Sequence, residues 1–191
     1  MPECLDAVRQ ILAAARFAAE KHSMQRRKSS MGEPYVNHLM EVAELVSRTA
    51  DELDTNLIVA ALLHDTIEDT GATRAEIAAR FGEDVATLVA EVSDDKTLPK
   101  ERRKALQIEN APKKSARAQA LSTADKIANL RSIMHSPPAN WNFERKLEYV
   151  RWARRVVGGY AHVNGRLSEE FERTNAALQE WEISGGTKVF F

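Results

Sequence analysis

Residues 60 to 70 read Ala-Ala-Leu-Leu-His-Asp-Thr-Ile-Glu-Asp-Thr and place four ionisable side chains at the end of an apolar run. The run begins at Leu57, and none of residues 57 to 63 has a polar side chain. This composition predicts a helix that is buried on all sides. Charged groups at the end of such a helix are costly unless they are paired or bind a cation. The stretch is therefore a candidate site.

The spacing within this stretch indicates how the four groups are arranged. If the helix continues through residue 70, residues four apart share a face, so that His64 lies over Glu68 and Asp65 over Asp69. We expect a metal-binding pair, His64 and Asp65, one turn before a pair of carboxylates that handle protons.

Helical periodicity continues along the whole chain, and no alternating run of β-branched residues indicates a sheet. We find no internal repeat and no linker long enough to separate domains. The sequence therefore predicts an all-α fold, a compact single-domain helical bundle over residues 1–183, followed by a tail of residues 184–191. The expected helices cover approximately residues 5–22, 34–46, 55–63 with its extension toward 70, 73–82, 85–92, 100–110, 121–133, 142–157 and 167–181.

Composition narrows the function classes. The chain has 191 residues and a formal net charge of −1, which argues against a general nucleic-acid binder. No apolar run approaches the length of a membrane span, no signal peptide is evident, and the single cysteine fits a reducing cytoplasm. Basic residues cluster at 26–28, at 100–104 and at 113–114. If these clusters surround the carboxylate site, they suit a small and highly anionic substrate.

Two further residues extend the candidate site. His38 and Asp125 both lie within or beside apolar helical faces, where an unpaired charge is unfavourable. Together with His64 and Asp65 they supply two imidazoles and two carboxylates from three helices, a donor set that suits Mn²⁺, Fe²⁺ or Zn²⁺. Such an ion polarises a phosphoryl oxygen and activates bound water. No Gly-x-x-x-x-Gly-Lys-Ser/Thr loop is present, so ATP-dependent phosphoryl transfer is not indicated.

The pattern of His38, His64-Asp65 and Asp125 resembles that of the HD-domain metal phosphohydrolases. Over approximately residues 5 to 160 the chain is similar to one subgroup, the RelA/SpoT-type hydrolases of guanosine tetraphosphate, and particularly to the stand-alone small alarmone hydrolases akin to the metazoan SpoT homologue. The segments that support this resemblance are Arg26–Lys28, Pro34–His38, Ala60–Thr70, Val92–Lys100 and Ala124–Arg131.

The resemblance implies a compact helical enzyme that removes the 3′-pyrophosphate of (p)ppGpp, giving GDP or GTP plus pyrophosphate, and that uses one Mn²⁺. It implies that His38, His64, Asp65 and Asp125 are the metal ligands. Glu68 and Asp69 would activate or place the attacking water. The implied substrate contacts are Arg27 and Lys28 for the base and phosphates, Asn129 for the ribose side, Lys100 and Arg145 for phosphates, and Tyr149 for the pocket wall. We expect Trp141 and Trp152 to be core aromatics.

Other functions remain compatible with these residues. One is a metal phosphohydrolase of another nucleotide, such as NADPH. A second is a non-catalytic nucleotide sensor, although such a protein does not need Glu68 and Asp69. A third is a helical scaffold in which the polar cluster is a buried ion-pair network. The chain has no room for the synthetase domain of the long bifunctional members, so a hydrolase alone is expected, and the oligomeric state is open.

Overall fold

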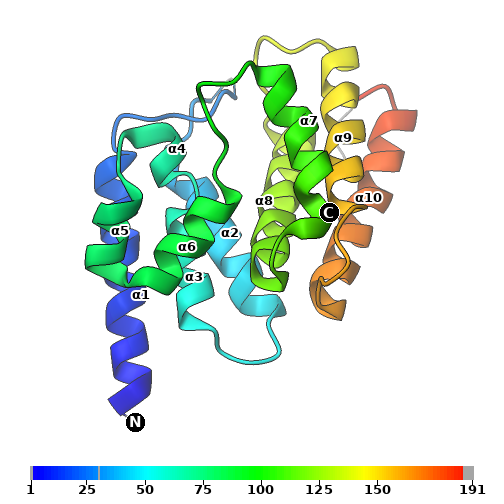
Figure 1. Cartoon of the computed structure of the whole chain (residues 1–191). Coiled ribbons are helices and arrows are strands. Elements are labelled where there is room, and N and C mark those ends of the chain that lie inside the picture. The colour runs from blue at the N-terminus through cyan, green and yellow to red at the C-terminus, as the bar shows by residue number, and fades with distance from the viewer. Residues whose placement is uncertain (1, 30, 187–191) are drawn as a thin grey trace.

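A computed structural model of the chain describes residues 2–29 and 31–186. In this part of the chain all regular structure is helical, and the β pairings found in it are two isolated bridges, Arg26–Pro34 and Ser29–Pro138. The all-α prediction is confirmed (Figure 1). The helices are α1 (Pro2–Lys21), α2 (Val36–Thr49), α3 (Thr55–Leu63), α4 (Thr66–Thr70), α5 (Arg74–Phe81), α6 (Glu83–Val92), α7 (Lys100–Asn110), the 3₁₀ helix η1 (Ala111–Lys113), α8 (Ala116–His135), α9 (Phe143–Val157) and α10 (Gly165–Ile183).

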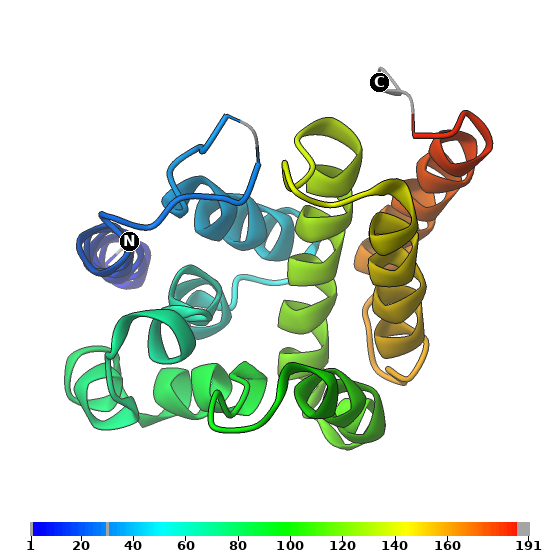
Figure 2. The same cartoon turned by 90° about the horizontal axis from the view of Figure 1, so that it is seen from above.

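The core is built around α3 and α8. Every residue from Leu57 to Leu63 is buried, as the unbroken apolar run predicts. Helix α8 is buried along most of its length and contacts α2, α3, α6, α9 and α10. Seen from above, α8 separates α2, α3 and α6 on one side from α9 and α10 on the other (Figure 2). The two buried helices therefore give the side chains at their ends a fixed frame.

The prediction of one continuous helix through residue 70 is wrong. Helix α3 ends at Leu63, and α4 begins only at Thr66. Between them Asp65 has φ −95° and ψ −2°, outside the range of a regular helix, so the chain turns before α4. His64 therefore lies outside the helix that carries Glu68, whereas Asp65 caps α4 and its carbonyl accepts a 2.9 Å hydrogen bond from the N–H of Asp69.

Side-chain caps mark the starts of several helices. Asp54, Thr73 and Asn142 each accept a hydrogen bond from the backbone N–H three residues later, at the starts of α3, α5 and α9. Helix α8 begins about five residues before its expected start, because Ser115 caps it through the N–H of Ala118. This serine directly follows the pair Lys113-Lys114, so its capping role has no apolar pattern beside it in the sequence.

Three connections meet at one end of the bundle, at the top of Figure 1: residues 22–35, residues 93–99 and residues 136–142. The first and third are joined by the Ser29–Pro138 bridge and by a 3.0 Å hydrogen bond from the N–H of Ala139 to the carbonyl of Lys28. This end of the bundle carries the site described below.

The chain ends beyond α10. Ser184 to Gly186 form a turn in which the N–H of Gly186 donates to the carbonyl of Trp181 at 2.9 Å. Residues 187–191 of the expected tail lie outside the described residues. None of the described helices combines the length and the apolar character needed to cross a membrane.

Candidate active site

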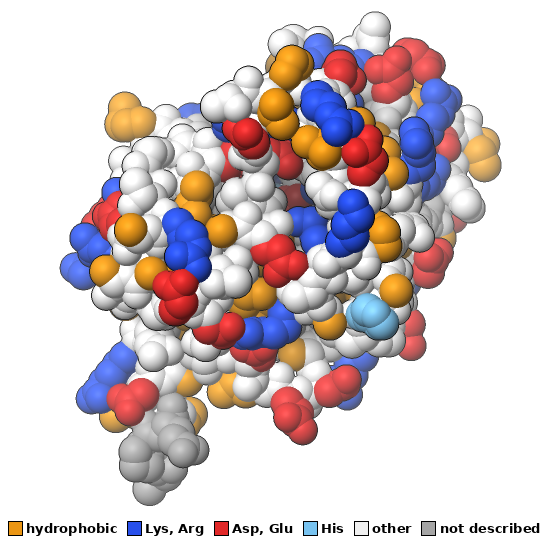
Figure 3. Space-filling model, in the orientation of Figure 1, with side chains coloured by type: hydrophobic (Ala, Val, Ile, Leu, Met, Phe, Trp, Pro, Cys, Tyr) orange, Lys and Arg blue, Asp and Glu red, His pale blue; other side chains and the backbone are white. Residues whose placement is uncertain are grey.

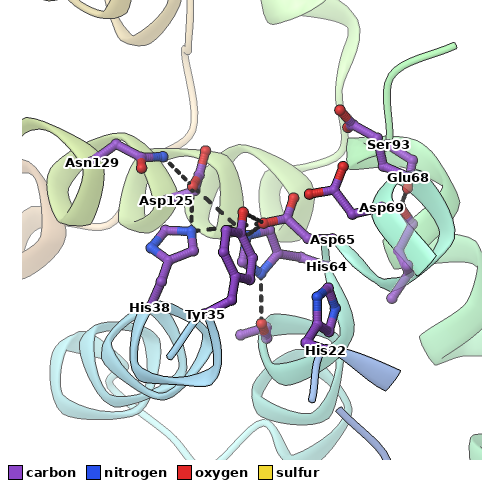
Figure 4. A network of polar contacts seen from close by, with 12 residues as sticks. His22, Tyr35, His38, His64, Asp65, Glu68, Asp69, Ser93, Asp125 and Asn129 are labelled. Atoms are coloured by element: carbon purple, nitrogen blue, oxygen red, sulfur yellow. Dashed lines mark hydrogen bonds and ion pairs between the residues drawn. The ribbon is translucent and has the colours of Figure 1, made fainter. Parts of the chain in front are cut away.

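Two buried histidines face two carboxylates at the end of the core (Figure 4). His38 lies on α2 and His64 follows α3. Nε2 of His38 lies 3.1 Å from Oδ1 of Asp125 and 3.8 Å from Oδ2 of Asp65. Nε2 of His64 lies 3.1 Å from Oδ2 of Asp65 and 3.7 Å from Oδ1 of Asp125. The structure therefore brings together all four ligands predicted from the sequence.

The imidazole orientations fit a bound cation. Nδ1 of His64 lies 2.8 Å from the carbonyl of Ala61 and donates to it, which directs Nε2 toward the carboxylates. Within the described part of the chain, Nε2 of His38 and of His64 is buried without a hydrogen-bond partner. Donor atoms of His38, His64 and Asp65 all lie within 4.8 Å of one another. These residues can hold a metal ion, and Asp125 stands beside them with a further oxygen.

The two carboxylates of this cluster favour a positive charge between them, as the pKa values of the neighbouring groups indicate. Burial opposes ionisation of Asp65, but the adjacent His64 imidazole holds the pKa of this carboxyl below its ordinary value. Burial likewise opposes a charged His64, yet the Asp65 carboxylate raises the pKa of that imidazole. Burial lowers the pKa of His38 and keeps it in the neutral form that binds metals. A divalent ion would supply the positive charge that the carboxylates attract.

Donors from neighbouring side chains orient both carboxylates. Tyr35 donates to Oδ2 of Asp65 at 2.6 Å. Lys126 donates to Oδ2 of Asp125 at 2.9 Å, and Asn129 donates to Oδ1 of the same residue at 2.6 Å. Partners of this kind fix the direction in which a ligand presents its lone pairs.

Glu68 and Asp69 lie on α4, next to the cluster (Figure 4). Oε2 of Glu68 accepts a 3.1 Å hydrogen bond from the N–H of Asp94. Lys96 pairs with both acids, at 2.9 Å to Glu68 and 2.8 Å to Asp69. Burial raises the pKa of Glu68, although the bond from Lys96 opposes that change. A raised pKa makes a carboxylate a better proton acceptor near neutral pH.

A cavity of about 570 Å³ opens beside these acids, within the range of pockets for small molecules. Asp65, Glu68 and Asp69 form part of its wall. The residues predicted to contact the substrate all line the same cavity: Arg27, Lys28, Lys100, Asn129, Arg145 and Tyr149.

Two of the three basic clusters identified in the sequence, at 26–28 and 100–104, border this cavity, whereas the lining does not include Lys113 or Lys114. Arg26, Lys96, Arg103 and Lys104 also line it. Burial, helped by the nearby Lys104 and Arg145 charges, lowers the pKa of Lys100. Cations crowded in this way attract a multiply charged anion. Elsewhere, on the face shown in Figure 3, basic and acidic side chains are interspersed rather than gathered into one basic surface.

One wall of the cavity is aromatic. The rings of Trp141 and Tyr149 lie 5.7 Å apart, those of Tyr149 and Trp152 lie 5.3 Å apart, and Arg145 lies 4.7 Å above the ring of Trp141. Burial raises the pKa of Tyr149 to about 12, so its hydroxyl stays neutral. The expectation that Trp141 and Trp152 are core aromatics is incomplete, because both rings pack on the core and also line the cavity.

Comparison with known proteins places this site in a family. The sequence model of the HD domain matches residues 14–155. The chain belongs to the HD domain family. The guanosine-3′,5′-bis(diphosphate) 3′-pyrophosphohydrolase MESH1 of Xenopus tropicalis is 48% identical over 162 residues, which cover 85% of this chain and 90% of that protein. The Homo sapiens protein of the same name is 48% identical over 160 residues, covering 84% of this chain and 89% of that one.

The HD domain fold is also seen in a solved structure. That structure is described as a metazoan orthologue of SpoT that hydrolyses ppGpp and plays a role in starvation responses. It matches with a TM-score of 0.84 and 41% identity, and the match covers 87% of this chain and 94% of that one. The resemblance predicted from the sequence is thereby confirmed.

Several residues of this HD domain site were not predicted. Tyr35 and Lys96 lie inside the segments that support the family resemblance, yet nothing in their spacing assigns them a contact. Gln25, which donates to Asp69, and Lys126, which donates to Asp125, were also missed. A lysine next to an aspartate within an apolar helix was a usable signal for Lys126, because a buried cation needs a partner.

Proposed function

We propose that the protein is a metal-dependent (p)ppGpp 3′-pyrophosphohydrolase, which converts its substrate to GDP or GTP plus pyrophosphate. The observation that carries the proposal is a buried cluster of imidazoles and carboxylates at the wall of a cation-lined cavity. The strong identity to proteins named for this reaction supports the substrate assignment.

The proposed metal ligands are His38, His64, Asp65 and Asp125. Their mixed nitrogen and oxygen donors fit a divalent ion, and we propose Mn²⁺. When bound, such an ion polarises a phosphoryl oxygen and lowers the pKa of water. This assignment is supported by the two buried Nε2 atoms, which face carboxylate oxygens and have no hydrogen-bond partner among the described residues.

Glu68 and Asp69 are the proposed catalytic acids. Glu68 would accept a proton from the attacking water, a role supported by its raised pKa and its place in the cavity wall. Asp69 would hold the water in line, and Lys96 would limit the repulsion between the two carboxylates and an anionic substrate.

The remaining cavity residues would bind the nucleotide. Arg27 donates to Oδ1 of Asn129 at 2.9 Å, so the two side chains present one joined surface to the ribose and phosphates. We propose that Lys28, Lys100 and Arg145 contact phosphates or the base. Tyr149 and the tryptophans beside it provide flat faces for a purine.

Residues 1–183 would form the hydrolase domain and residues 184–191 a tail, and we propose a cytoplasmic location because the single Cys4 fits a reducing compartment. None of the contacts described above favours another nucleotide or a sensor role over the proposed reaction.

The test is incubation of the purified protein with ppGpp and Mn²⁺, with and without a chelator, with products separated by ion exchange. The expected result is release of GDP and pyrophosphate that stops when the chelator is added. Glu68→Gln should bind metal and nucleotide while turnover falls by orders of magnitude. A parallel reaction with NADPH identifies a broader substrate range, and tight binding of ppGpp without turnover by the wild-type protein would instead establish a sensor.

A further inference from the structure

Asp69 is held by donors from two separate connections. Its Oδ1 accepts from Nζ of Lys96 at 2.8 Å, and its Oδ2 accepts from Nε2 of Gln25 at 2.9 Å. Lys96 belongs to the connection of residues 93–99, and Gln25 to that of residues 22–35. Because both oxygens are engaged, the plane of the carboxylate is fixed.

The Gln25 amide is itself held by a buried histidine. Oε1 of Gln25 lies 2.5 Å from Nδ1 of His22. A carboxylate only accepts hydrogen bonds, so Gln25 turns its NH₂ group to Asp69 and its carbonyl to His22. Nδ1 of His22 must then carry a proton and donate. The negative charge of Asp69 therefore sets the direction of both hydrogen bonds in the series His22–Gln25–Asp69.

His22 cannot easily leave this position. Only 2% of the residue is exposed, and its ring stacks on Tyr35 with centroids 5.2 Å apart and an interplanar angle of 17°. The N–H of Gln25 donates to the carbonyl of His22 at 2.9 Å, and the N–H of Tyr35 donates to the carbonyl of Gln25 at 3.1 Å. Figure 4 shows His22 close beside Tyr35, whose hydroxyl donates to Asp65.

We propose that Gln25 is a positioning residue that orients Asp69 for the reaction, and that His22 acts through Gln25 by donating from Nδ1. The inference rests on the proposed catalytic role of Asp69. A neutral amide suits this position, because it fixes the carboxylate without adding a second positive charge to the one on Lys96. The side chain of Lys96 is 47% exposed, and a flexible ammonium alone fixes direction poorly.

The first test is Gln25→Leu, which removes the donor and keeps a similar volume. We expect kcat to fall about 10- to 100-fold, the range for loss of an orienting partner. Although Gln25 lines the cavity, both ends of its amide are engaged by Asp69 and His22, so KM and metal content should change less than about twofold. Gln10→Leu, on the exposed face of α1, is the matched control. A wild-type kcat in Gln25→Leu would overturn the proposal.

A pair of variants isolates the role of His22. His22→Asn places an amide N–H near the position of Nδ1, whereas His22→Leu supplies no donor, and both lose the ring stacked on Tyr35. We expect His22→Asn to retain most of the wild-type kcat and His22→Leu to resemble Gln25→Leu. Equal losses in both variants would show that the ring is needed only for packing.

A double-mutant cycle separates positioning from general damage. In an Asp69→Asn background, Gln25→Leu should lower the remaining kcat by less than about twofold, because the group it positions is already altered. Additive losses would mean that Gln25 acts independently of Asp69.

The closing experiment needs no turnover and so separates this inference from the proposed function. Nitrogen-15 NMR of the full-length protein reports which ring nitrogen of His22 is protonated. The expected result is a proton on Nδ1 and a Gln25 side-chain amide resonance that moves in Asp69→Asn. A neutral His22 with its proton on Nε2 would overturn the inference even if ppGpp is hydrolysed, and the expected signals would support the hydrogen-bond chain even if ppGpp is not the substrate.

Discussion

Lys126 donates a 2.9 Å hydrogen bond to Oδ2 of Asp125, the residue before it in the chain, although only 6% of Lys126 is exposed. Its ammonium also lies 5.0 Å from the centre of the Trp152 ring. Burial opposes the charged amine, but the Asp125 carboxylate raises the pKa of Lys126 well above its ordinary value. The pair leaves Oδ1 of Asp125 facing His38.

Replacement of Lys126 by methionine should therefore weaken metal binding. Without the ammonium, Oδ2 of Asp125 loses this donor while Asn129 still holds Oδ1, and we expect metal affinity to fall about 10- to 100-fold. Metal titration of the apoprotein measures this loss. Lys113→Met, at an exposed position of η1, is the control. An unchanged affinity would show that Lys126 serves only to balance charge.

Removal of a proposed metal ligand should have a larger effect. Asp125→Ala leaves Nε2 of His38 facing empty space in place of the oxygen now 3.1 Å away. We expect the purified variant to lose most of its bound metal while its helical circular dichroism is retained. Metal analysis by mass spectrometry checks the prediction, and full occupancy would contradict the ligand role of Asp125.

The pH dependence of turnover should report Glu68. Burial raises its pKa, so the active carboxylate form is lost at a higher pH than for an exposed glutamate. Activity should decline as the pH falls through this raised value. Lys96 opposes the shift through its hydrogen bond, so Lys96→Met should move the acidic limb of the kcat/KM profile further upward. A limb that moves downward or stays fixed would exclude Glu68 as its source.

Truncation of the aromatic wall should affect binding rather than chemistry. Trp141→Ala removes the ring that lies against Tyr149 and beneath Arg145. Stacking of a base on an aromatic ring contributes roughly 1–3 kcal/mol, so KM for ppGpp should rise by about 5- to 150-fold. Saturating kcat should stay near that of the wild-type protein, and a fall in kcat at unchanged KM would place Trp141 outside the nucleotide contacts.

A buried carboxylate away from the site should control acid stability. Glu170 is 6% exposed and is bonded by Arg48, Arg173 and Arg131, which hold its pKa at about 2 against the opposing effect of burial. Because the pKa is lower when folded, this stabilisation is present above the ordinary value of 4.5 and is lost as the pH falls toward 2.

Glu170→Gln should remove that stabilisation at neutral pH as well. The loss expected from leaving charged partners without their acceptor is about 1–3 kcal/mol. Urea unfolding at pH 7 measures it, with Glu169→Gln on the exposed face of α10 as the control. Equal stability of the two variants would mean that the arginines are satisfied by solvent.

The sequence was sufficient for features that depend on nearby residues. The apolar run from 57 to 63 predicts a buried helix, and short polar residues such as Asp54 and Thr73 mark where helices begin. The four proposed ligands were predictable because imidazoles and carboxylates on apolar faces need partners.

Contacts between distant segments were not predictable in this way. Gln25 and Asp69 are separated by 44 positions, and Arg27 and Asn129 by 102. No periodicity relates such residues, because their meeting depends on how the helices pack. The turn at Asp65 was also missed, since an apolar helix followed by polar residues gives no local signal for a change in direction.

The proposed metal ligands and the cations of the cavity lie on different parts of the fold. Three of the four proposed ligands, His38, His64 and Asp125, lie on buried helices or at their ends, whereas Arg27, Lys28 and Lys96 lie on the connections above. Substitutions at Arg27 and Lys28 can thus alter which phosphorylated compound is selected without moving the proposed metal ligands, whereas Gln25 and Lys96 on the same connections also hold Asp69. Substrate preference can therefore change during evolution at the cation positions of the connections while the proposed metal ligands on the helices stay in place.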